Sequence, residues 1–106
     1  MTLAEYAAVL ETTGLPVAYL AFDETDVPEM PFITYQETGS NNFGADGKVY
    51  QPVKQIQVDL FSNKKDIVAE TKLEEAFNNA SIFWQKVQTV DDDEDCQIYT
   101  YETEVI

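Results

Sequence analysis

The first residues of the chain combine a helix-capping signal with apolar residues at helical spacing. Thr2 and Glu5 have the spacing of a capping box, in which a hydroxyl and a carboxylate satisfy free N–H groups at the start of a helix. Apolar side chains then recur every three or four residues, at Leu3, Tyr6, Ala7 and Leu10. Gly14 favours the left-handed conformation that ends a helix, and Pro16 prevents its continuation. The pattern predicts a helix from about residue 3 to residue 13.

Two strand-forming segments come next. Residues 17–22, VAYLAF, are rich in strand formers and predict a first strand. Pro28 and Pro31 keep the following stretch extended, so that residues 32–35 are predicted as the second strand. The segment 38–47, TGSNNFGADG, holds three of the chain's four glycines and is predicted to be a loop.

A third strand is predicted for residues 48–61, with Pro52 indicating an edge or a bulge near its start. Apolar and polar residues alternate from residue 55 to 60, QIQVDL, so one face of this strand is expected to be buried and the other exposed to solvent. A second helix follows, with Ser62 or Asn63 as its N-cap. Its apolar stripe consists of Ala69, Leu73, Ala76, Phe77 and Ala80.

Residues 83–90 and 96–105 are predicted as two further strands around the acidic turn DDDED at 91–95. The element order α-β-β-β-α-β-β allows a mostly antiparallel sheet with short connections and two helices on one face. The expected architecture is therefore a single α+β domain over residues 1–106.

Composition excludes several function classes for this fold. The chain has 20 Asp and Glu residues against 6 Lys, with no Arg and no His, for a formal net charge of -14. It therefore lacks imidazole for acid–base chemistry or zinc binding and guanidinium for clamping phosphate. A polyanion is repelled, because binding it requires cations that displace its counterions. Direct nucleic-acid binding is not expected.

Nucleophilic catalysis is also disfavoured. Ser62 and Ser81 have no histidine base, and the lone Cys96 has neither a histidine partner nor a second cysteine for a disulfide. We expect a non-enzymatic protein without cofactor or metal. The start of the chain has no basic signal-peptide region, and no apolar stretch approaches the roughly 18 residues of a membrane span, so a protein that is soluble when made is expected.

The acidic turn resembles part of a calcium loop. Asp91, Asp93, Asp95 and Glu102 occupy ligand positions of the calcium-loop template. Cys96 stands where the sharp turn requires glycine, and a strand rather than a helix is predicted to follow. We interpret the turn as a solvated hairpin tip, with weak and non-specific cation binding as the alternative.

Aromatic residues are numerous, with 6 Tyr, 6 Phe and 1 Trp. Core packing explains most of the group Phe22, Phe32, Phe61, Phe77, Phe83 and Trp84. Tyr99 and Tyr101 fall on one face of the last strand, and Phe43 and Tyr50 flank the glycine-rich segment. Tyrosines on a strand face often serve subunit contacts, so Tyr50, Tyr99, Tyr101 and Phe43 are the predicted contact residues.

Four segments carry a resemblance to a known family: PFITY at 31–35, IQVDLFSNKKD at 56–66, LEEAF at 73–77 and CQIYTYE at 96–102. From about residue 15 to 105 the chain resembles small tail-gene proteins in long-tailed phages and prophages of Gram-positive bacteria, of the tail-terminator, tail-completion or head–tail joining type. The resemblance implies an α+β subunit that forms an oligomeric ring, with a hexamer as the first hypothesis. Such a ring caps the tail tube and joins it to the head.

The implied partners are further copies of the chain, the tail tube and the head–tail connector proteins, and the implied location is the host cytoplasm during assembly and then the virion tail. An acidic surface would let DNA slide through such a ring without sticking. The competing hypothesis is an acidic DNA mimic that inhibits a host DNA-binding protein. Acids in a double track would favour the mimic, and a hydrophobic edge patch would favour the ring.

Overall fold

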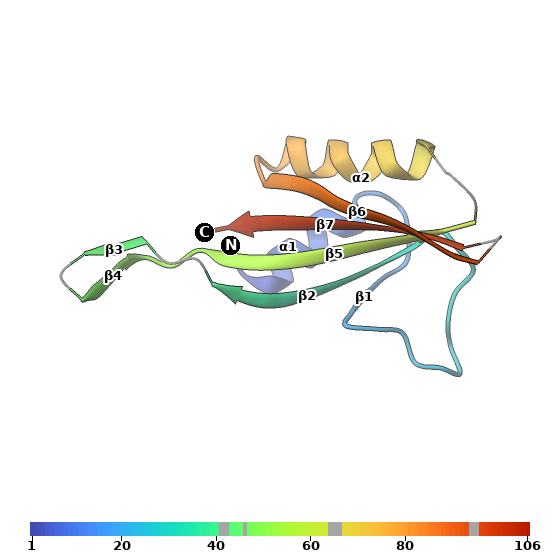
Figure 1. Ribbon diagram of the computed structural model, residues 1–106, viewed down its shortest axis with the longest axis horizontal. Helices are drawn as coiled ribbons and strands as arrows, with labels where there is room; N and C mark the ends of the chain where they lie inside the picture. Colours follow the sequence, from blue (N-terminus) through green and yellow to red (C-terminus); the bar gives the residue numbers. More distant parts are fainter. Residues whose placement is uncertain (41–42, 46, 64–66, 94–95) are drawn as a thin grey trace.

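The computed structural model describes residues 1–40, 43–45, 47–63, 67–93 and 96–106, and for 43–45, 48–51 and 88–93 it describes the backbone alone. Its elements are α1 (Leu3–Glu11), β1 (Val17–Tyr19), β2 (Phe32–Ser40), β3 (Phe43–Ala45), β4 (Lys48–Gln51), β5 (Lys54–Ser62), α2 (Ile67–Asn79), β6 (Phe83–Asp93) and β7 (Cys96–Val105). Five strands form one sheet in the order β1-β2-β5-β7-β6 (Figure 1). Every neighbouring pair in this sheet is antiparallel except β1 with β2. The α+β prediction is confirmed.

Both helices lie over the same face of this sheet (Figure 1). Tyr101 and Thr103 are two residues apart on β7, so their side chains point to one face. The Tyr101 hydroxyl donates to Glu74 of α2 at 2.8 Å, and the hydroxyl oxygens of Thr103 and Tyr6 of α1 lie 2.6 Å apart. The fully buried side chains around these contacts are Leu10, Ile33, Ile56, Val58, Leu60, Leu73 and Phe77.

None of the described helices covers the opposite face of the sheet, which we call the open face. Its residues on β5 and β7 are Gln55, Gln57, Asp59, Thr100, Glu102 and Glu104, which alternate with the buried ones. One end of this face is covered by residues 20–31, because Phe22 packs edge-on against Phe32 at 5.2 Å. Phe32 in turn stacks on Phe61 at 4.9 Å. The polar remainder of the face is left open.

Several boundaries differ from the sequence prediction. Helix α1 ends at Glu11, with Thr12 as its C-cap, while Gly14 takes the expected positive φ of 79° two residues later. The predicted strand 17–22 stops at Tyr19, because Leu20 adopts a φ of 67° and leaves the extended region.

The predicted loop 38–47 is wrong in part. Residues 38–40 extend β2, whose register against β5 reaches Ser40 opposite Lys54, and 43–45 form β3 against β4. Strand pairing overrides the turn composition of this segment, with β5 as the partner of residues 38–40 and the neighbouring β4 as the partner of residues 43–45. Pro52 divides the predicted strand 48–61 into β4 and β5, as its missing N–H leads one to expect.

The second helix is confirmed as α2. Ser62 is the last residue of β5 and is buried. The predicted cap at Ser62 or Asn63 depends on the residues just before Ile67, which lie outside the described ranges. The last two strands are confirmed, with β6 longer than predicted and β7 matching the predicted 96–105.

Candidate interaction surface

Three features gather at the end of the sheet from which the β3–β4 hairpin leaves, and we call this region the hairpin end (Figure 1). The first is the hairpin itself. The second is an apolar cleft where the two chain termini meet, and the third is a hollow in the open face. Figure 1 shows both termini at this end, and the N-terminal ammonium of Met1 donates to the carbonyl oxygen of Ile106.

The hairpin extends the molecule along its longest axis. Strands β3 and β4 pair with one another and form a sheet separate from the main one. The hairpin stands away from the helices and the five-stranded sheet (Figure 1), and the molecule measures 51 × 27 × 24 Å. A two-stranded hairpin is at best marginally stable in water without something to pack against. This arm is therefore a natural point of contact with another molecule.

The apolar cleft, which we call the chain-end cleft, lies beside the base of the hairpin. It has a volume of about 380 Å³. Its apolar lining is Met1, Val53, Ala80, Ile82, Phe83, Val105 and Ile106, and Ser81 and Glu104 complete the wall. Phe83 is 66% exposed and Ile106 is 64% exposed. Large apolar side chains left this accessible at adjoining positions favour association with another surface.

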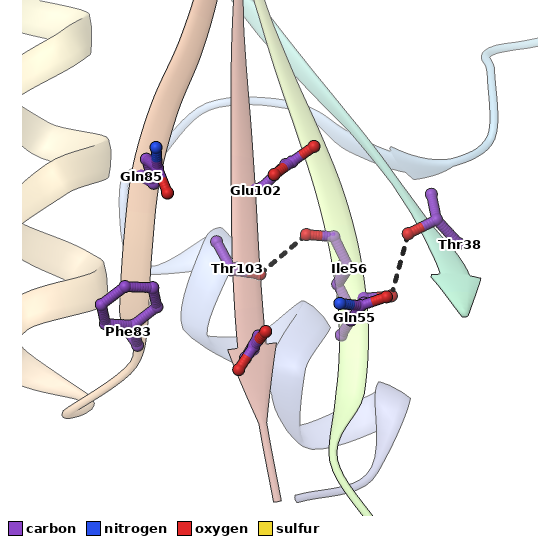
Figure 2. Close-up of a pocket in the computed structure, with 8 residues that line it drawn as sticks. Thr38, Gln55, Ile56, Phe83, Gln85, Glu102 and Thr103 are labelled. Carbon is purple, nitrogen blue, oxygen red and sulfur yellow. Dashed lines mark hydrogen bonds between the residues drawn. The ribbon is translucent and has the colours of Figure 1, made fainter. Parts of the chain in front are cut away.

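The hollow in the open face has a volume of about 120 Å³. Figure 2 shows its polar side chains on four strands, with Thr38 on β2, Gln55 on β5, Glu102 on β7 and Gln85 on β6. Phe83 forms one wall and is shared with the chain-end cleft. The Thr38 hydroxyl donates to the Gln55 carbonyl oxygen at 3.4 Å, which ties β2 to β5 at the edge of the hollow.

The electrostatics of the hollow are set by Glu102 and Glu104, which both line it. Among the lysines whose side chains are described, none reaches these carboxylates. Lys54 donates to the Met1 carbonyl oxygen at 3.0 Å, Lys72 lies on α2, and Lys86 pairs with α2 on the helix-covered face. Within the described part of the chain the hollow is therefore a negative site without a cation.

The predicted contact residues on β7 are not at this surface. Tyr99 is 2% exposed and Tyr101 is 0% exposed, since both lie beneath α2. A side chain with almost no exposed area has none to offer a neighbouring subunit, so this prediction is wrong for these two residues. The side chains of Phe43 and Tyr50 lie outside the described part of the structure, and their backbones belong to β3 and β4.

Phe83 is an exception among the aromatic residues that are mostly expected in the core. It points to the open face (Figure 2), while its neighbour Trp84 packs against the core cluster. Successive side chains on a strand point to opposite faces. Two consecutive aromatic residues at the start of β6 therefore already required one of them to leave the helix-covered face.

A second charged cluster lies on the helix-covered face and holds α2 against the sheet. The Lys86 ammonium pairs with Glu70 and, at 3.1 Å, with Glu74, and it stands 5.6 Å from the centre of the Tyr101 ring. Burial lowers the pKa of Lys86, but hydrogen bonds and charge from Glu70 and Glu74 outweigh it, so this pKa lies above its usual value. The role of this cluster is therefore structural: it holds α2 against the sheet.

The acidic turn does not complete a calcium loop. Asp93 pairs with Cys96 across the β6–β7 ladder, whereas Glu102 lies six residues further along β7. At about 3.4 Å per residue the two positions are roughly 20 Å apart, too far for one ion. Asp95 lies outside the described residues. Within the described ranges, no three His, Cys, Asp or Glu side chains are grouped so that they could hold a metal.

No known family and no curated protein sequence matches this chain. None of the helices in the described ranges is long and apolar enough to cross a membrane.

Proposed function

We propose that this chain is a non-enzymatic structural protein of a phage or prophage virion. It acts as a tail-terminator or tail-completion component that forms an oligomeric ring at the head–tail junction, with a hexamer as the first hypothesis. The observation that carries the proposal is the hairpin end, where a projecting arm stands next to exposed apolar residues. The resemblance of residues 31–35, 56–66, 73–77 and 96–102 to phage tail proteins supports the choice of virion component.

The hairpin end provides what a ring subunit needs. In a head-to-tail interface, a projecting element of one subunit meets a different surface of the next, and the contact closes into a ring when the rotation allows. The β3–β4 arm is such an element, and the chain-end cleft with Phe83 and Ile106 is an apolar surface for a neighbour. The subunit assembles in the host cytoplasm and then remains in the virion tail, in contact with tail-tube and connector proteins.

The DNA-mimic alternative finds less support. A mimic needs carboxylates arrayed like phosphates along two tracks. On the described open face, Asp59, Glu102 and Glu104 are interspersed with glutamines such as Gln55 and Gln57. The exposed apolar residues of the hairpin end favour assembly over mimicry.

Ring formation is tested by negative-stain electron microscopy and light scattering of the purified chain over a range of protein and salt concentrations. We expect ring-shaped oligomers whose share of the protein rises with salt concentration. Subunits with a net charge of -14 repel one another, and salt screens this repulsion. Ile106→Ser in the chain-end cleft should weaken assembly. Ile67→Ser is the matched control, since Ile67 is 65% exposed on the first turn of α2, away from the hairpin end.

Location in the virion is tested separately by immunogold labelling of phage particles induced from the source bacterium. Gold at the head-proximal end of the tails is the expected result. Particles that remain unlabelled, together with a purified chain that is monomeric at every protein and salt concentration, would overturn the proposal.

A further inference from the structure

We propose that the hollow in the open face is a docking site for an arginine-bearing segment of a partner protein. The site uses the carboxylates of Glu102 and Glu104, the ring of Phe83, and the side-chain oxygens of Thr38, Gln55 and Gln85. The hollow shares Phe83 and Glu104 with the chain-end cleft that the ring proposal uses, but the partner chemistry is different. The test below is made on the monomer, so its outcome does not depend on ring formation.

The negative charge of the hollow determines that its occupant carries positive charge. Glu102 and Glu104 line the hollow, and none of the lysines with described side chains reaches them. An anionic partner such as nucleic acid is repelled. A second copy is a poor occupant as well, because this chain has no Arg and a net charge of -14. A cationic segment from a different protein provides the complementary charge.

The remaining lining selects arginine. A guanidinium group is planar and carries five N–H donors and no acceptor, so it requires oxygen acceptors around it. Gln55, Gln85 and Thr38 present such oxygens on three strands. Phe83, 66% exposed, lies at the wall of the hollow, and an aromatic ring attracts a cation placed over its face.

The size of the hollow also fits a side chain rather than a larger ligand. Its volume of about 120 Å³ accommodates a guanidinium group with part of its aliphatic stem. The hollow opens on the uncovered face of the sheet and spans strands β2, β5, β7 and β6 (Figure 2). An extended segment can therefore lie across the strands while one arginine enters.

The test is a titration of the ¹⁵N-labelled chain with the capped peptide Gly-Arg-Gly-Arg-Gly, followed by NMR at low salt and at a protein concentration where light scattering finds the monomer. We expect the amide shifts to concentrate at Gln55, Gln85, Glu102 and Glu104. The double variant Glu102→Gln/Glu104→Gln should bind about tenfold more weakly, and Phe83→Ala severalfold more weakly. The spectrum of each variant reports directly whether it is folded.

The matched control is Glu24→Gln/Glu29→Gln, which removes the same two charges from exposed positions in residues 20–31. Its affinity for the peptide should stay within about twofold of the wild type. The corresponding glutamine peptide should not bind. If the control variant loses as much affinity as the Glu102/Glu104 variant, or if the shifts spread over the whole acidic surface, binding reflects net charge and the proposed site is wrong.

Discussion

Removing the positive charge of Lys86 is expected to destabilise the fold more than removing that of any other lysine with a described side chain. Lys86→Met keeps most of the aliphatic stem and deletes the ammonium, which lies over the Tyr99 and Tyr101 rings at 5.9 and 5.6 Å from their centres. The change leaves Glu70 and Glu74 close together beneath α2 without a cation between them. The expected loss is therefore electrostatic.

Burial of the three side chains sets the magnitude. The side chain of Lys86 is 33% exposed, that of Glu70 is 11% exposed and that of Glu74 is 26% exposed. Fully exposed ion pairs contribute about 0–1 kcal/mol, and breaking a fully buried pair costs about 3–5 kcal/mol. This cluster lies between the two limits, so we expect a loss of about 2 kcal/mol in the free energy of unfolding, or roughly 10 °C in Tm for a domain of this size.

The assay is urea denaturation followed by circular dichroism, arranged as a double-mutant cycle of Lys86→Met and Glu70→Gln. The double variant should lose about 1 kcal/mol less than the sum of the single variants, because neutralising Glu70 removes part of the uncompensated charge. Lys72→Met on the exposed side of α2 is the control and should change stability by no more than about 0.5 kcal/mol. Equal effects of Lys86→Met and Lys72→Met would refute the reasoning.

Four further results are expected. Tyr6→Phe should lower the free energy of unfolding, measured by chemical denaturation, by about 1–2 kcal/mol. The Thr103 hydroxyl donates its proton to the Ile56 carbonyl oxygen, so in the buried pair the Tyr6 hydroxyl is the donor to Thr103, and the substitution removes this hydrogen bond. Burial raises the pKa of both Tyr6 and Tyr101, so above about pH 10 the folded chain holds more protons than the unfolded one. The free energy of unfolding should therefore fall as pH rises from about 9 to 11. A denaturation midpoint that stays constant over this range would contradict this pH dependence. Gly14→Ala should cost about 1 kcal/mol through backbone strain alone, since φ is 79° and an added Cβ meets no atom within 4 Å; a thermal melt unchanged from wild type would count against this. Replacing residues 41–51 by a short glycine turn should leave the α1, α2 and main-sheet amide spectrum intact while abolishing ring assembly, and collapse of the spectrum would show that the arm is part of the core.

The predictable part of the fold is local. The capping box of Thr2 and Glu5 forms as its spacing predicted, with both hydrogen bonds present. The alternation in β5 and β7 also places the buried residues on one face as predicted. The capping box joins residues that are close in sequence, and the alternation repeats over many residues. For these reasons tertiary contacts do not override either pattern.

The candidate surface was much less predictable. The hairpin arm depends on the pairing of β3 with β4, which forms strands in a segment whose composition indicates a loop. The exposure of Phe83 depends on which face of β6 the helices cover. The burial of Tyr99 and Tyr101 depends on where α2 docks, and their alternation on the strand was compatible with either a core or a subunit contact. The exposure of Phe83 and the burial of Tyr99 and Tyr101 are decided by partners far away along the chain.

By itself, the sequence determined most of the element types, the amphipathic faces of β5 and β7 and the strongly acidic charge, because these depend on residue identity and on spacing along the chain. Only the tertiary structure decided which face the helices cover, and hence which aromatic residues are buried and which are exposed. It also brought Thr38, Gln55, Phe83 and Glu102 into one hollow. The physical reason is that the order and register of the strands, rather than proximity in sequence, determine which side chains share a surface.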